Sequence, residues 1–303
     1  MLCRSTTTLS TKLLRLSSAL RLVSSKRQVL SLHYKFSSSL SNYKENSSNA
    51  REQRVYWRKI YENKNDVFTL DDVNPNLEKY WEHMNISTTS SQTSPSSTAS
   101  SSLPRILVPC CGKDISMVWM VERYNVAVVG VDFVGEPLRA LGQEIGGGLK
   151  PLAEIRTSAP HLPTATAYQV NSLPQLILLH GDLLYLQSPN DFGGSSYFDA
   201  CWDRASLTSI SQSSRLHYVK KIGQALRPKG KLLLEFLSSN YISSEGNGGV
   251  VSLDEVNDLL ESSNMFENVK ILSKKDVRHD FPNYKPQGLK YLDEIVLVCS
   301  RKE

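Results

Sequence analysis

Two short apolar runs, separated by a turn and a helix-forming stretch, constrain the fold of this chain more than any other feature. The first run, residues 105–109, ends in a Cys-Cys-Gly-Lys turn, and residues 115–124 have the spacing of a short helix. The second run, 126–131, ends in Asp132. Strand, turn, helix, strand and acid within 28 residues predict the first βαβ unit of a parallel sheet.

The turn between these runs excludes two phosphate-binding motifs. A Walker A loop needs Gly five residues before Gly112 and Ser or Thr after the lysine, where this chain has Leu107 and Asp114. A GxGxxG fingerprint is also absent, since Gly112 stands alone. A cofactor without phosphate fits better, and S-adenosylmethionine is the first candidate, with Asp132 placed to accept hydrogen bonds from the ribose hydroxyls. A nucleotide-free α/β domain is the alternative.

Further apolar runs alternate with amphipathic stretches, which predicts a doubly wound α/β domain with a mostly parallel sheet. The stretch 146–174 is rich in Gly, Pro and Thr and is expected to be an excursion before the third strand. The turn 227–230 is expected to lead into a later strand. The expected strands are 105–109, 125–131, 175–180, 198–202, 231–237 and 290–300, and the expected helices are 115–124, 136–145, 212–226 and 252–261.

The positive charge of the chain is concentrated at its N-terminus. Residues 1–44 hold eight basic residues and no acid, so the other 27 basic residues are balanced by 30 acidic ones. The leader is also rich in Ser and carries leucines at helical spacing, which is typical of a transit peptide. We expect a mitochondrial location, with a plastid, or a cytoplasmic protein with a disordered basic tail, as the alternatives. The mildly acidic remainder favours no nucleic-acid partner.

Differences in composition divide the rest of the chain into three segments. Residues 45–86 read as an N-terminal helical lid rich in aromatics, and 87–102, almost wholly Ser and Thr, as a disordered loop. Residues 103–303 form the α/β domain. No apolar run is long enough for a membrane span, and a monomer is expected. The five cysteines lack a CxxC pair and the six histidines lack ligand spacing, so no metal site is expected.

Polar residues follow two further strands where open α/β sheets bind ligands. Asp182 and Leu183 come after the strand 175–180 and are placed to meet an adenine ring, although Asp182 is also a good helix N-cap. Asp203 and Arg204 follow the expected strand 198–202. The arginine fork suits a carboxylate, such as the amino-acid end of the cofactor, and a structural ion pair is the alternative.

The ordered set of motifs resembles the thiopurine S-methyltransferase family over roughly residues 52–236, with a weaker tail to 300. The motifs are Trp57-Arg-Lys-Ile-Tyr61, Phe68, Val73-Asn-Pro, Val108-Pro-Cys-Cys-Gly-Lys113, Val129-Gly-Val-Asp132, Gly181-Asp182 and Trp202-Asp-Arg-Ala205. The resemblance implies a class I methyltransferase that depends on S-adenosylmethionine, with a Rossmann-like sheet of seven strands.

The resemblance also implies a role for each matched residue. Trp57, Tyr61 and Phe68 would close over the cofactor, where an aromatic ring beside a sulfonium is a cation–π contact. Cys110 and Gly112 would line the methionine end, and Asp132 would hold the ribose. Asp182 and Leu183 would frame the adenine, and Arg204 would lie near the site of methyl transfer.

The chain departs from the family pattern in four places. Tyr61 replaces a second lid Trp, Asp132 replaces Glu, and Cys110 replaces the Leu of the turn. After Glu235 the family's Asp and Gly-Pro-Pro-Phe segment is missing, and residues 236–250 read differently. The sequence therefore supports the cofactor more strongly than any particular acceptor.

The expected activity is methyl transfer to a small molecule with a thiol or similar soft nucleophile. A thiol is partly ionised near neutral pH and needs no dedicated base. No catalytic residue is assigned, and Asp203 and Arg204 are considered only as orienting groups. The alternative is a weak or inactive methyltransferase-like protein with an assembly or scaffolding role in mitochondria. Binding of S-adenosylhomocysteine separates the two.

Overall fold

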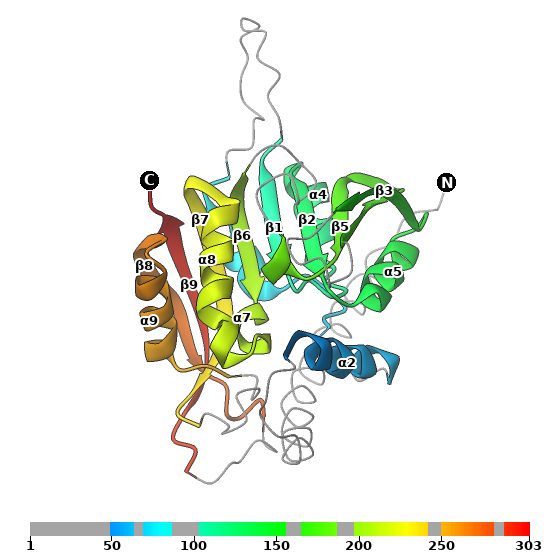
Figure 1. Ribbon diagram of the computed structural model, residues 1–303. Coiled ribbons are helices and arrows are strands. Elements are labelled where there is room, and N and C mark those ends of the chain that lie inside the picture. Colours follow the sequence, from blue (N-terminus) through cyan, green and yellow to red (C-terminus); the bar gives the residue numbers. More distant parts are fainter. Residues whose placement is uncertain are drawn as a thin grey trace, which may run out of the picture.

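The computed structural model describes residues 49–63, 69–86, 103–155, 165–186, 197–241, 250–281 and 288–303. The leader 1–44, the loop 87–102 and Phe68 lie outside the described residues. The described chain forms one twisted sheet with helices on both faces (Figure 1). The predicted α/β class is confirmed.

The sheet has nine strands rather than seven, in the order β3-β4-β5-β2-β1-β6-β7-β9-β8. Its centre is parallel, from β5 to β7, and both edges are antiparallel. The strands are β1 (Arg105–Pro109), β2 (Ala127–Asp132), β3 (Leu149–Ile155), β4 (Ala165–Val170), β5 (Leu173–His180), β6 (Phe198–Arg204), β7 (Leu226–Ser239), β8 (Phe266–Asp276) and β9 (Leu292–Arg301).

The two strands beyond seven form the hairpin β3–β4, which lies within the predicted excursion 146–174. The edge strand β8 was also absent from the expected strands. Five consecutive residues of β3 are exposed, so this edge strand carries none of the apolar pattern by which strands are recognised. The turn expected at 227–230 falls within β7. Phe198 of β6 pairs with Leu226 and Ala200 with Lys231, so the intervening residues form an irregularity at which Lys229 has φ +64°.

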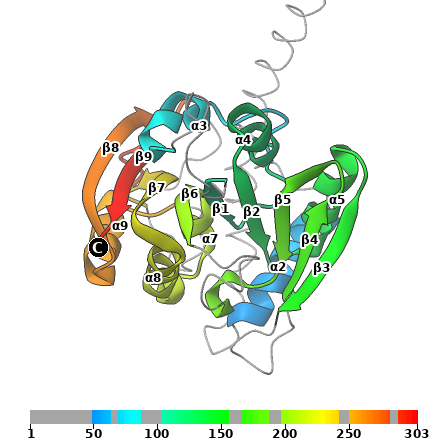
Figure 2. The ribbon, with the colours of Figure 1, turned by 90° about the horizontal axis from the view of Figure 1, so that it is seen from above.

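Helices cover the sheet on two sides. Figure 2 shows α3 (Pro75–Tyr80) and α4 (Ser116–Tyr124) on one side of the row of strands and α7 (Ser206–Ser209) and α8 (Arg215–Ala225) on the other. The predicted helices 115–124, 136–145 and 252–261 are observed within two residues, and 212–226 divides into a 3-10 turn and α8. The other helical elements after β1 are α5 (Gly135–Glu144), η2 (Leu183–Tyr185), η3 (Gln212–Ser214) and α9 (Leu253–Ser263).

Each face of the sheet has its own hydrophobic core. Leu107, Leu234 and Phe236 belong to the core beneath α8 and α9, and Ile106 and Leu233 belong to the core beneath α4. Neighbouring residues of one strand thus face opposite cores, because successive side chains of a strand alternate between faces. Burial on both sides is typical of the parallel centre of such a sheet.

The N-terminal helical unit divides into two parts. Helix α2 (Asn49–Glu62) lies beneath the sheet in Figure 1, at its carboxyl edge. Helix α3 (Pro75–Tyr80) and η1 (Trp81–Met84) instead join the core on the α4 face, where Trp81 stacks on Tyr124 with ring centroids 3.9 Å apart. Among the described helices of this unit, α2 is the one that lies at the carboxyl edge, where a lid is expected.

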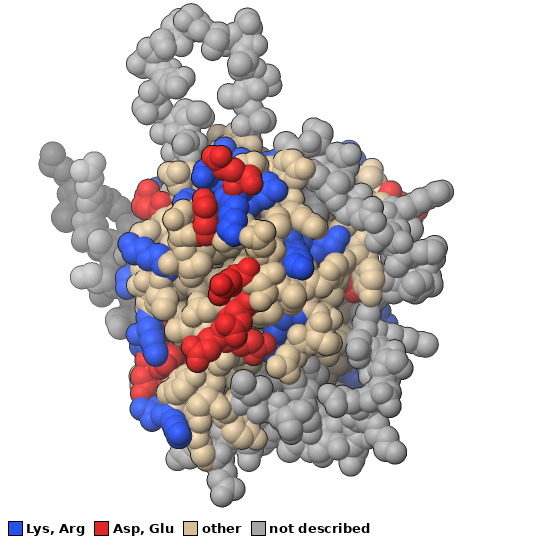
Figure 3. Space-filling model, turned by 60° about the vertical axis from the view of Figure 1, so that its left-hand side comes forward, with Lys and Arg blue, Asp and Glu red and all other residues tan. Residues whose placement is uncertain are grey.

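Charges of both signs lie side by side on the face shown in Figure 3. Ion pairs link the strands of this edge: Lys274 of β8 pairs with Asp293 of the neighbouring β9 at 3.4 Å, and Lys229 of β7 pairs with Glu267 of β8 at 3.2 Å. Among the described residues, none of the helices combines the length and apolar character required to cross a membrane.

Candidate functional site

The turn after β1 brings the backbone close to α2. Cys110 and Gly112 both have left-handed backbones, with φ of +42° and +50°. A Cβ on Gly112 would lie 2.6 Å from the Tyr61 hydroxyl oxygen, so glycine is required for this approach. Burial raises the pKa of the Cys110 thiol well above its usual range. Cys110 is therefore suited to line a site as a neutral thiol and not to act as a nucleophile.

Asp132, the last residue of β2, is tied to the same turn. One carboxylate oxygen accepts the Gly112 backbone N–H and the other accepts the Val134 N–H, each at 2.8 Å. Burial raises the Asp132 pKa to about 6, although both hydrogen bonds oppose the shift. The carboxylate is thus held at a fixed position, with lone pairs left for further donors.

The end of β5 contributes Asp182 and Leu183. Asp182 accepts the Leu184 N–H at 3.1 Å and so caps the 3-10 turn η2, which confirms the capping alternative. Asp182 also lines a hollow together with Asp132 and the buried Leu183. Capping and site lining are therefore compatible for this residue, as a carboxylate can accept several bonds.

The predicted pair at the end of β6 points in two directions. Asp203 is buried; it accepts a hydrogen bond from the Tyr218 hydroxyl at 2.6 Å and one from the Ser206 N–H at 3.0 Å. Burial raises the Asp203 pKa to about 6. Arg204 lines a larger hollow, and its Nε lies 3.8 Å from Oε1 of Glu235. Asp203 thus stabilises the turn that follows β6, and Arg204 is the member of the pair that lines the hollow.

Helix α2 presents one face to the site. Gln53, Trp57 and Tyr61 follow at intervals of four residues and line the two hollows. Trp57 is held edge-on against Tyr56, with ring centroids 5.1 Å apart. Trp57 and Tyr61 therefore lie where the sequence predicts lid residues.

The two hollows share five lining residues and therefore form one cleft along the carboxyl edge. The smaller one extends toward Asp182 and Leu183, and the larger one toward Arg204 and an apolar wall. The shared residues are Cys110, Asp132, Phe133, Ser209 and Ile210, and the apolar wall includes Leu70, Phe236, Leu237 and Phe281.

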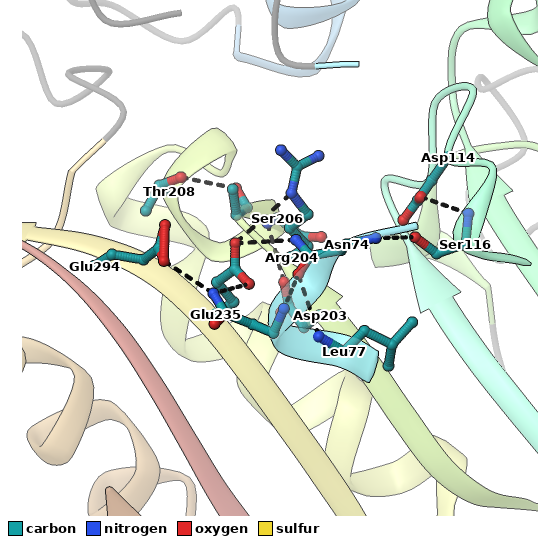
Figure 4. Close-up of polar contacts among 12 residues, drawn as sticks. Asn74, Leu77, Asp114, Ser116, Asp203, Arg204, Ser206, Thr208, Glu235 and Glu294 are labelled. Carbon is teal, nitrogen blue, oxygen red and sulfur yellow. Dashed lines mark hydrogen bonds and ion pairs between the residues drawn. The ribbon is translucent and has the colours of Figure 1, made fainter. Parts of the chain in front are cut away.

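A polar network at the larger hollow was not predicted (Figure 4). Asn74 and Asn76 of the α3 start donate to the buried Glu235 at 3.2 and 2.9 Å, and Asn76 also donates to Glu294 at 2.9 Å. The available signals were the Val73-Asn-Pro motif and a single acid within the apolar run 232–236. Neither signal indicates that residues 161 positions apart meet.

In the described part of the chain, no cluster of three His, Cys, Asp or Glu residues is suited to a metal ion. The strand tips instead offer a carboxylate, a close-approach glycine and aromatic rings within one cleft. These residues fit a nucleoside with a sulfonium tail, because the Asp132 carboxylate can accept hydrogen bonds from ribose hydroxyls and Trp57 offers a π face.

Comparison with known proteins identifies the family of the chain. The family model described as Thiopurine S-methyltransferase (TPMT) matches residues 52–302. The chain belongs to this family. A thiopurine S-methyltransferase of Shewanella woodyi is 28% identical over 252 residues, covering 82% of this chain and 98% of the relative. One of Nitrosospira multiformis is 25% identical over 248 residues, covering 81% and 97%.

A solved structure shows the same fold. It is the 1,6-didemethyltoxoflavin-N1-methyltransferase of Burkholderia thailandensis with 1,6-didemethyltoxoflavin and S-adenosylhomocysteine bound. It aligns with a TM-score of 0.51 and 17% identity, over 86% of this chain and 94% of that chain. Membership of the TPMT family makes the chain an S-adenosylmethionine-dependent methyltransferase.

Proposed function

We propose that this TPMT-family enzyme methylates a small molecule that carries a thiol or similar soft nucleophile. The observation that carries the proposal is the larger hollow, which adjoins Asp132 and Cys110 and has an apolar wall beside Arg204. A soft, polarisable acceptor suits apolar surroundings better than a strongly hydrated one. The relatives named as thiopurine S-methyltransferases support the same class of acceptor.

The strand tips would hold the cofactor in parts. Asp132 would hold the ribose, and Asp182 with Leu183, which line the smaller hollow, would frame the adenine. Cys110 and Gly112 would line the methionine portion. When bound, S-adenosylmethionine supplies a methyl group on an electrophilic sulfonium. Trp57 and Tyr61 would cover that charge with their rings and exclude water from the acceptor.

The chain's own contribution to the reaction is mainly positioning. The Asp203 carboxylate faces Tyr218, and the Glu235 carboxylate is held by two asparagine amides, so neither is arranged as a general base. A thiol of ordinary pKa ~8.5 is a few per cent ionised near neutral pH and needs none. Alignment of the reactants can supply several kcal/mol of barrier reduction, up to ~7–11.

Matched acceptors test the proposal. The purified full chain is incubated with S-adenosylmethionine and with aromatic and aliphatic thiols, each paired with the alcohol and the amine of the same skeleton. Mass spectrometry should detect the S-methyl product, with little or no O- or N-methyl product. Faster methylation of the alcohols or amines would contradict the thiol assignment. Absence of transfer to every acceptor together with absence of S-adenosylhomocysteine binding would favour an assembly role.

A further inference from the structure

Glu235 is an acid within the core of the sheet. It interrupts the apolar run Leu232-Leu-Leu-Glu-Phe236 and is 8% exposed. A buried carboxylate is costly unless charged or hydrogen-bonding groups compensate it. The packing of β7 against the core does not need a charged residue at position 235. The groups that contact Glu235 therefore indicate its role.

The partners of Glu235 from the N-terminal segment are rigidly placed. The side-chain oxygen of Asn74 accepts the backbone N–H groups of Asn76 and Leu77 at 2.7 and 3.2 Å, which caps α3. Its amide nitrogen then donates to Oε1 of Glu235, while the Asn76 amide donates to Oε2. Helix α3 therefore fixes both oxygens of the carboxylate.

Arg204 lies on the other side of the same carboxylate. Arg204 and Glu235 are directly paired residues of the parallel strands β6 and β7, and Nε of Arg204 lies 3.8 Å from Oε1 of Glu235. Figure 4 shows the outer end of the guanidinium pointing away from Glu235. At 3.8 Å this is an ion pair and not a hydrogen bond, so Glu235 attracts the inner side of the guanidinium electrostatically while the outer end is left for the larger hollow, which Arg204 lines.

We propose that Glu235 is a positioning residue for this enzyme, which holds the Arg204 guanidinium at the larger hollow and is itself held by Asn74 and Asn76. The proposal rests on the function proposed above, together with the expectation from the family resemblance that Arg204 lies near the site of methyl transfer. It gives the docked helix α3 a role in the site, although α3 lies on the sheet face and not over the carboxyl edge.

A double-mutant cycle tests this proposal in the full chain. Calorimetry gives the affinity for S-adenosylhomocysteine of the wild type, Glu235→Gln, Arg204→Met and the double variant. Loss of a charged hydrogen bond predicts about tenfold weaker binding for Arg204→Met. Glu235→Gln should weaken binding about three- to tenfold, but less than about twofold when Arg204 is already Met. Glu267→Gln, which removes a surface ion pair with Lys229, is the control and should bind as the wild type does.

The outcomes separate the possible failures. Equal losses from Glu235→Gln in both backgrounds, or no loss in either, would overturn the positioning role and leave the proposed function intact. Normal binding by Arg204→Met would overturn the placement of Arg204 and, with it, this inference. Thiol methylation by the wild type is scored independently of binding. If Glu235→Gln does not fold, Asn76→Ala replaces it in the cycle, because Asn76 is only partly buried and holds the same carboxylate.

Discussion

The contact between Gly112 and Tyr61 provides a quantitative test of how α2 meets the strand tips. Gly112 has φ +50°, and a Cβ there would lie 2.6 Å from the Tyr61 hydroxyl oxygen and 3.7 Å from the ring carbon that carries it. Gly112→Ala therefore combines a backbone strain with a clash confined to one hydroxyl. The two effects should appear in different measurements.

The backbone strain affects stability. A left-handed alanine costs about 1–2 kcal/mol, and the lost freedom of the unfolded chain returns about 0.4–1 kcal/mol. The free energy of unfolding should therefore fall by about 1 kcal/mol. The clash costs less stability, because the hydroxyl at the end of the Tyr61 side chain can swing aside. Its displacement from the cleft should instead weaken S-adenosylhomocysteine binding, by about tenfold if one hydrogen bond and its packing are lost.

Denaturant unfolding and calorimetry on Gly112→Ala, Tyr61→Phe and the double variant separate the two effects. Without the hydroxyl, the nearest remaining ring carbon is at ordinary contact distance, so Gly112→Ala should cost little binding in the Tyr61→Phe background. The stability loss should persist. Gly148→Ala is the control, since φ is +71° and a Cβ there meets nothing within 4 Å; it should lose stability and keep its affinity. An equal binding loss from Gly112→Ala in both backgrounds would refute the reasoning.

Three further outcomes are expected. Burial raises the pKa of Asp132 from 3.8 to about 6. Protonation of Asp132 therefore adds to the free energy of unfolding; this contribution is complete below pH 3.8 and is lost as the pH rises to about 6. The ionised form is the better acceptor for ribose, so S-adenosylhomocysteine affinity should rise through about pH 6, and an unchanged rise in Asp132→Asn would contradict this assignment. Tyr218→Phe should lower the free energy of unfolding by about 1–3 kcal/mol, because the buried Asp203 loses its donor, with affinity unchanged; a stability loss below about 0.5 kcal/mol in denaturant unfolding would argue against this bond. Residues 1–44 fused to a fluorescent reporter should direct it to mitochondria; diffuse cytosolic fluorescence would contradict the transit-peptide assignment, and plastid fluorescence would redirect it.

Much of the sheet was predictable because its central strands are buried on both faces. The runs around Leu107 and Val129 are continuous and apolar, the run around Leu233 is broken by Glu235, and each corresponds to a strand. The edge strands gave no such signal. β3 carries Lys150 and Glu154 on exposed positions, and β8 is largely exposed, so neither shows the pattern of a core strand.

The site was predictable where chemistry follows directly after a strand. Asp132 and Asp182 were found in this way, because the carboxyl ends of parallel strands meet at one edge. Asp203 followed the same rule, yet its side chain turns inward to Tyr218, and the sequence does not specify that direction. The Glu235 network depends on α3 docking against the sheet, which is a tertiary contact without a local sequence signal.

Hydrogen exchange with and without saturating S-adenosylhomocysteine tests the central claim most directly, namely that one cleft between α2 and three strand tips holds the cofactor. Protection should increase at 110–114, at 132–135 and at 181–184, and also in α2, whose Trp57 and Tyr61 line the cleft. The control is β8, at the far edge of the sheet, whose exchange should not change. Unchanged exchange at the three tips in a protein that calorimetry shows to be saturated would contradict the account.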